Sequence, residues 1–170
     1  MDLQHLIERA KEIILKDGEH PPILYAETKD GKINLFYFAD FPDTTKEKQY
    51  TLFGLGRKYG IECPGSENKI AHLYFVVEAW MSTNRNYNRP SEDPNRKEAL
   101  TILHLDVSTM KTTLDRAEML RDGSGELVDL LTLEPMVKGV EDNLLPAFLA
   151  GTRSAKMSDA ELMRKLTGQG

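Results

Sequence analysis

Residues 70–107 read IAHLYFVVEAWMSTNRNYNRPSEDPNRKEALTILHLDV, two apolar runs on either side of a long polar segment. In the first run every second residue from Ala71 to Met81 is apolar, and the second run repeats this pattern, with one threonine, from Ala99 to Val107. A period of two is typical of a strand that turns one side to a core. We therefore predict that the two runs form the central strands of a sheet.

The other side of both strands is amphipathic. It carries, in chain order, His72, Tyr74, Val76, Glu78, Trp80, His104 and Asp106. Because polar and apolar side chains alternate there with no continuous apolar stripe, we expect helices to cover this side only in part.

The N-terminal part of the chain predicts a helix and a hairpin. Apolar residues spaced three and four apart indicate a helix that Gly18 ends. Two apolar runs around Asp30 and Gly31 predict a hairpin, because glycine accepts the positive φ of a tight turn. The second of these runs, residues 33–39, is apolar on nearly both sides, so we expect it to lie inside the sheet.

A second helix is predicted after this hairpin. Thr44 and Glu47 form a capping-box pattern at its start, and Gly60 is expected to end it. Gly54 and Gly56 lie inside, each at a cost of about 1 kcal/mol relative to alanine. We expect these glycines to allow a close contact between the helix and the sheet.

The C-terminal part adds strands and then helices. Residues 110–120 and 126–133 look like two strands joined by a hairpin turn, and residues 143–151 and 158–168 read as two short helices. Ser158 with Glu161 forms a second capping box.

These elements predict an α+β fold in a single domain over residues 1–170, with a largely antiparallel sheet of about six strands. An N-terminal helix, a middle helix and the C-terminal helices flank the sheet, and residues 152–170 are expected to form a mobile helical tail. The order of helix, hairpin, helix and consecutive strands is similar to that of profilin-like and roadblock-like domains. This resemblance is one of order alone, and a fold does not fix a function.

Composition narrows the classes of partner. The 170 residues are 40% hydrophobic and 29% charged, with a formal net charge of −5. These values are typical of a soluble globular domain, and the acidic balance disfavours nucleic acid and membrane surfaces as partners. Cys63 is the single cysteine, which excludes an intrachain disulfide and leads us to expect a cytoplasmic location.

The sequence contains no phosphate-binding glycine loop, nucleophile elbow or HExxH pair, so no cofactor is expected. Pro42 with Asp43, and Glu67 with Lys69, resemble the letters of the PD-(D/E)xK nucleases. In that family the second motif lies on a strand and the aspartate ends the preceding strand. Here the surrounding pattern predicts a turn-rich passage and the start of a helix instead.

The polar segment, residues 82–98, is the least ordinary part of the chain. Connections longer than about 12–15 residues are usually functional or disordered. This segment has nearly balanced charges and two stiffening prolines, Pro90 and Pro94, so we expect its second half, residues 89–98, to be ordered. Three interpretations remain open: a structural loop held by its own ion pairs, a loop that binds a ligand or partner, and a disordered segment.

Three hypotheses for function follow. The first is a non-enzymatic binding or adaptor domain that meets a protein or small ligand through this segment. Its candidate binding residues are Trp80, Arg89, Glu92, Asp93, Arg96 and Glu98. The second is a metal-dependent hydrolase or nuclease, whose metal ligands would be His72, Glu78, His104 and Asp106. The third is a homo-oligomer built through an exposed strand or the C-terminal helices.

Overall fold

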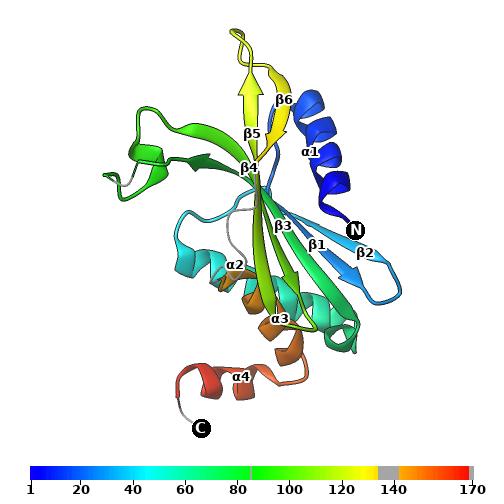
Figure 1. Ribbon diagram of the computed structural model, residues 1–170. Helices are drawn as coiled ribbons and strands as arrows, with labels where there is room; N and C mark the ends of the chain where they lie inside the picture. The colour runs from blue at the N-terminus through cyan, green and yellow to red at the C-terminus, as the bar shows by residue number, and fades with distance from the viewer. Residues whose placement is uncertain (85, 134–141, 169–170) are drawn as a thin grey trace.

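The computed structural model describes residues 1–84, 86–133 and 142–168. A twisted sheet lies at its centre, with α1 on one face and α2 and α3 on the other (Figure 1). The strands are β1 Ile23–Thr28, β2 Ile33–Tyr37, β3 Ile70–Met81, β4 Lys97–Asp106, β5 Lys111–Arg121 and β6 Leu127–Thr132. The helices are α1 Leu3–Asp17, α2 Thr45–Glu62, α3 Leu144–Ser154 and α4 Asp159–Leu166, with the 3-10 turns η1 Ser66–Asn68 and η2 Pro90–Glu92.

The sheet confirms the predicted α+β class. Its strand order is β2-β1-β3-β4-β5-β6, and every neighbouring pair is antiparallel. The two runs that we expected at the centre are β3 and β4, and they pair without a break from His72–Asp106 to Met81–Lys97. Consecutive strands therefore lie side by side along most of the sheet.

The position of β2 corrects one prediction. We expected this strand inside the sheet, but it lies at the edge, where it pairs with β1. Its apolar residues lie in two different environments. Phe36 packs under the helices, with its ring centroid 5.3 Å from that of Tyr59, while Ile33, Leu35 and Tyr37 are exposed on the other face.

The core on the α1 face is built by a single amphipathic helix. The Asp2 side chain caps α1 by accepting a hydrogen bond from the His5 N–H at 2.8 Å, and Gly18 ends the helix with a φ of 83°. Buried side chains of α1 pack on alternate residues of the central strands. This core contains Leu6, Ile7, Ala10, Ile14, Ile23, Tyr25, Tyr74, Val76, Leu100, Ile102, Ala117, Met119, Leu127 and Leu130.

The core on the opposite face depends on close contact between two helices. A Cβ at Gly56 would lie under 3.0 Å from the carbonyl oxygen of Phe148, and one at Gly151 would lie equally close to the backbone of Phe53. The predicted tight contact at Gly56 therefore exists, but α3 makes it rather than the sheet. At Gly54 the structure is open.

Helix α2 also continues past Gly60, which we expected to end it, and finishes at Glu62. Gly60 faces α3 instead, because a Cβ there would meet Thr152 and Ala155. Two glycines of α2 thus lie in the interface between the helices, where small residues let backbones approach closely.

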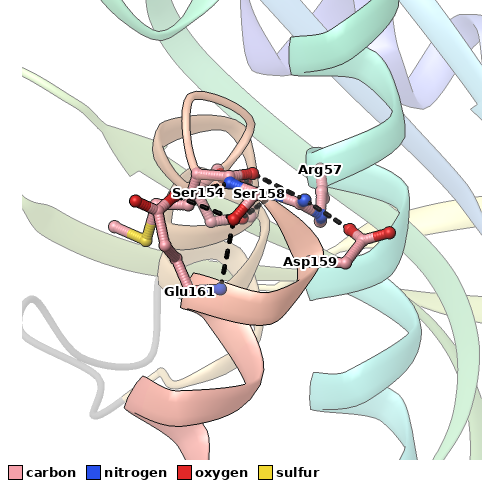
Figure 2. A network of polar contacts seen from close by, with 7 residues as sticks. Arg57, Ser154, Ser158, Asp159 and Glu161 are labelled. Atoms are coloured by element: carbon pink, nitrogen blue, oxygen red, sulfur yellow. Dashed lines mark hydrogen bonds and ion pairs between the residues drawn. The ribbon is translucent and has the colours of Figure 1, made fainter. Parts of the chain in front are cut away.

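The two C-terminal helices meet at a polar clamp (Figure 2). The Arg57 guanidinium donates to the carbonyl oxygens of Ser154 and Met157 and pairs with the Asp159 carboxylate at 2.7 Å. The predicted capping box of Ser158 and Glu161 is present at the start of α4. Because α3 runs through Ser154, the first residues of the segment 152–170 belong to a packed helix in which Thr152 and Ser154 are buried.

Helix α4 itself buries no residue and extends away from the body (Figure 1). Mobility of residues 152–170 stays a prediction. None of the described helices combines the length and the apolar character needed to cross a membrane.

Candidate functional site

The side of β3 that faces α1 is covered only in its middle, as its amphipathic pattern predicts. Tyr74 and Val76 are buried beneath α1, whereas Trp80, near the end of the strand, is 47% exposed. The candidate binding residues and the candidate metal ligands therefore fall mainly into two groups, one at each end of β3.

The first group belongs to the connection between β3 and β4, and we call the described residues of that connection, 82–84 and 86–96, the arm. With the ends of both strands it projects away from the rest of the molecule (Figure 1). Its second half is ordered as predicted: η2 forms within it, the Glu92 N–H donates to the Arg89 carbonyl oxygen at 3.0 Å, and the Asp93 N–H donates to the Pro90 carbonyl oxygen at 3.2 Å.

Asp93 holds the arm together. Its carboxylate accepts hydrogen bonds from the Ser82 hydroxyl and from the Asn95 N–H, the latter at 2.8 Å, and its carbonyl oxygen accepts one from the Arg96 N–H at 3.1 Å. The residue is only 3% exposed. A buried carboxylate with several donors fixes a loop. Asp93, one of the candidate binding residues, thus lies inside the arm.

Trp80 and Arg96 form an exposed pair at the root of the arm. The Arg96 guanidinium carbon lies 4.4 Å from the centre of the Trp80 ring, which is cation–π geometry. Arg89 and Glu92 are also exposed, and neither forms an ion pair with another described residue. Four of the six candidate binding residues are therefore open to contact.

Glu98, the last candidate, is engaged with β5. Its two carboxylate oxygens accept from the Nε and Nη2 atoms of Arg121, at 2.6 and 3.0 Å. The hydrogen bonds from Arg121 to Glu98 raise the pKa of the arginine further. Lys97 likewise pairs with Glu118, at 2.9 Å. These ion pairs anchor the start of β4 to the sheet and are structural.

A hollow of about 480 Å³ lies at the base of the arm. Met81, Tyr87 and Pro90 line it, together with Arg116 of β5. Its volume is in the range of small-molecule and peptide side-chain sites. Sequence reasoning had no signal for Arg116, because only the β4–β5 register brings that residue near the arm.

The second group gathers at the opposite end of β3. His72 Nδ1 and His104 Nε2 lie 3.2 Å apart, and the Tyr74 ring stacks on His104 with centroids 4.5 Å apart. The Tyr74 hydroxyl lies 3.2 Å from Glu27 Oε2. Burial, and then His72, lower the pKa of His104, while burial and Glu27 raise that of Tyr74.

Glu27 is the member of this cluster that sequence reasoning missed. It lies opposite His72 in the β1–β3 register, and both its oxygens accept from the Met1 amino group, at 2.7 and 2.8 Å. Burial acts to raise the pKa of Glu27, but the hydrogen bond and charge of that amino group bring the pKa below its ordinary value. The carboxylate beside the histidines is thus already paired with the Met1 amino group.

The four proposed metal ligands do not form one site. Asp106 lies opposite His72, but the Ser108 hydroxyl and N–H bind its Oδ1 atom at 2.6 and 2.8 Å and bring its pKa to about 2. Glu78 lies six residues along β3, about 20 Å away, and accepts from the His20 N–H at 2.6 Å. The described residues contain no group of three or more His, Cys, Asp or Glu that could hold a metal ion.

Comparison with family models, with curated proteins and with solved structures finds no match for this chain. The element order that resembles profilin-like and roadblock-like domains is present, but the resemblance extends no further than that order. The function of this chain is therefore inferred from the two groups of residues described above.

Proposed function

We propose that this chain is a non-enzymatic binding or adaptor domain whose arm contacts a protein partner. The observation that carries the proposal is the exposed Trp80–Arg96 pair at the root of a projecting arm that Asp93 holds in one shape.

The residue types at this surface are those that dominate binding energy at protein interfaces. Tryptophan, tyrosine and arginine are enriched among such residues. Trp80 and Tyr87 are 47% and 36% exposed, Arg96 lies over the Trp80 ring, and Arg89 is exposed in the same segment. Because internal hydrogen bonds already order the arm, a partner that binds it loses less conformational entropy than one that must order a loose loop.

The charges favour a partner segment with acidic and apolar residues. One face of the Arg96 guanidinium is occupied by Trp80, and its Nη1 atom donates to the Asp93 carbonyl oxygen at 3.4 Å. The exposed side chain still offers its other N–H groups to carboxylates. Met81 lies on the opposite side of β3 from Trp80, so a segment that also placed an apolar side chain in the hollow lined by Met81, Tyr87 and Pro90 would pass around the edge of the arm. The proposal therefore specifies a short acidic and apolar stretch of a protein.

Cross-linking followed by affinity capture tests the proposal. The test variant is Arg89→Glu with Arg96→Glu, and the matched control is Arg9→Glu with Lys46→Glu, which makes the same change in charge at exposed positions elsewhere. We expect the wild type and the control to capture a common protein that the test variant loses, while all three melt alike. Retention of that protein by the test variant would contradict the proposal.

A direct readout of the same surface is available. Trp80 is the single tryptophan of the chain, so its fluorescence reports on the arm alone. Titration with the captured protein should shift and quench this emission in the wild type. An unchanged spectrum at saturation would mean that the partner binds elsewhere.

One observation favours the alternative of a metal-dependent enzyme. The 3.2 Å contact of His72 and His104 offers two nitrogen donors, although a site would need at least one further ligand. A panel of zinc, manganese and magnesium in thermal denaturation tests this, with His72→Asn as control. Equal melting temperatures with and without each metal would count against the enzyme.

A further inference from the structure

Among the described residues, only those of β1 and its flanks hydrogen-bond to the backbone of β2, which lies at the edge of the sheet. The Thr28 N–H donates to the Lys32 carbonyl oxygen at 2.8 Å, and the Phe38 N–H donates to the Pro22 carbonyl oxygen at 3.1 Å. In an antiparallel ladder alternate residues direct both backbone groups to the same neighbour. The N–H and C=O groups of residues 33, 35 and 37 therefore point away from β1.

The same three residues carry the exposed apolar side chains. Ile33, Leu35 and Tyr37 are 44%, 47% and 64% exposed, and the pairing of Leu35 with Tyr25 places the row on the α1 face. Natural edge strands are usually protected by charges, prolines or bulges. Residues 33–37 contain no charge and no proline, and their pairing with β1 has no bulge.

The strand at the other end of the sheet differs on these points. The β5–β6 pairing has a register shift between Leu120 and Arg121, which twists the strand. Asp129 of β6 is exposed and forms an ion pair with Lys11 of α1 at 2.5 Å. Strand β6 is thus protected by a charge and a bulge, whereas the edge of β2 has neither.

We propose that β2 pairs with β2 of a second copy of this chain, antiparallel and about a two-fold axis at Leu35. The sequence INLFY is self-complementary in this register, because Leu35 meets Leu35 and Ile33 meets Tyr37. A β-branched residue opposite an aromatic one is a favourable cross-strand pair. The interface is isologous and closes after two copies, so it forms a dimer and not a fibre.

Charges near the ends of β2 favour a second copy of this chain as the partner. Lys32, whose side chain is 82% exposed and pairs with Asp30 of its own chain at 3.5 Å, would face Phe38 of the second copy and have Asp40 as its diagonal neighbour. The two-fold axis produces this opposite-charge contact twice. Asp30, which also lies near the end, is already bound by the Thr28 hydroxyl at 2.5 Å.

The size of the contact sets the expected affinity. The interface is one strand wide and falls below the roughly 1,600 Å² of a standard protein interface. We therefore expect a reversible dimer with a dissociation constant in the micromolar range. The two apolar rows would lie next to each other on the α1 face, and each would shield part of the other.

Sedimentation velocity across a concentration series from micromolar to millimolar tests the dimer. Leu35→Lys adds a charge at the centre of the edge and should leave a monomer at every concentration. Val128→Lys is the matched control, because Val128 is 60% exposed on β6, and it should dimerise like the wild type. A wild type that stays monomeric throughout, or a dimer that Leu35→Lys does not weaken, overturns the proposal.

Cysteine cross-linking tests the register even if Leu35→Lys folds poorly. In a Cys63→Ser background, Leu35→Cys should form a disulfide-linked dimer, because directly opposite residues of a hydrogen-bonded pair have Cα atoms about 5.5 Å apart. Asn34→Cys should not, since Asn34 would face Phe36 of the second copy. Equal cross-linking by the two variants, or none by Leu35→Cys, contradicts the two-fold at Leu35.

Discussion

The two faces of the sheet are covered in different ways (Figure 1). On one face α2 and α3 touch through their backbones at Gly56, Gly60 and Gly151 and enclose a core of aromatic and aliphatic side chains. On the other face α1 alone covers the middle of the sheet. The exposed row of β2, the histidine pair and the root of the arm all remain on the α1 face.

The face covered by α2 and α3 therefore contributes mainly to stability, and the α1 face carries the surfaces that could contact a partner. Backbone-to-backbone packing at glycines leaves no room for change, because no flexible side chain can yield. The α1 face instead keeps exposed apolar and polar groups around a smaller core. Substitutions at the glycine contacts between α2 and α3 should therefore destabilise the protein most, whereas those on the α1 face should change association or the response to pH.

Gly56→Ala should have the largest effect. Its Cβ would meet the Phe148 carbonyl oxygen at under 3.0 Å, which forces α2 and α3 apart. We expect the free energy of unfolding in urea to fall by about 3–5 kcal/mol. Gly54→Ala, in the same helix but facing open space, should instead raise it by up to about 1 kcal/mol. Equal effects of the two variants would contradict the helix contact.

This pair of glycines also shows where sequence reasoning ends. The capping box, the hairpin glycine and the alternation in β3 and β4 are local signals, and each placed its element correctly. A glycine inside a helix indicates that some backbone comes close, but the backbone at Gly56 belongs to α3, some ninety residues later in the chain. Likewise, the apolar residues of β2 indicated burial without showing that Phe36 and Leu35 face different surroundings.

The next largest effect should come from His20, which makes the free energy of unfolding depend on pH. It lies between α1 and β1, is 3% exposed, and neither ring nitrogen has a hydrogen-bond partner among the described residues. Burial lowers its pKa from 6.5 to about 4, and the backbone of Pro21 offsets only part of this. The unfolded chain therefore binds the proton first, so the stability present above pH 6.5 is lost as the pH falls towards 4, by about 3 kcal/mol.

Chemical denaturation of His20→Leu at several pH values measures this contribution. The variant should be more stable than the wild type at pH 7, because two unpartnered buried nitrogens are gone, and the difference should widen as the pH falls. His5→Leu, at an exposed position of α1, should follow the wild type. A constant difference between His20→Leu and the wild type from pH 7 to pH 4 would show that His20 is not the group responsible.

The candidate site was predicted less completely than the fold, for a related reason. Charge density and prolines predicted an ordered arm, but charged residues in a loop have no periodicity, so nothing distinguished the buried Asp93 from the exposed Glu92. The register of β1 against β3 decides that Glu27 lies beside His72. Register between strands is set by packing across the whole sheet, and a local pattern does not show it.

The smallest of these effects should come from the clamp between α2 and the C-terminal helices (Figure 2). The Arg57 side chain is 13% exposed and binds two carbonyl oxygens, at Ser154 and Met157, as well as Asp159. Arg57→Ala should lower the free energy of unfolding by about 1–2 kcal/mol, because buried acceptors lose a charged donor. Asp159→Asn should change it by less than about 0.5 kcal/mol, since that carboxylate is 93% exposed.

Hydrogen exchange shows whether Arg57 stabilises α4 alone or the whole fold. Because α4 buries no residue of its own, loss of Arg57 should speed exchange of the α4 amides strongly and leave those of β3 and β4 almost unchanged. The same variant should dimerise and use its arm as the wild type does, since the Trp80–Arg96 pair and the exposed row of β2 both lie on the α1 face. If Arg57→Ala abolished either contact, the two faces of the sheet would be coupled, and the separation of stability from contact would not hold.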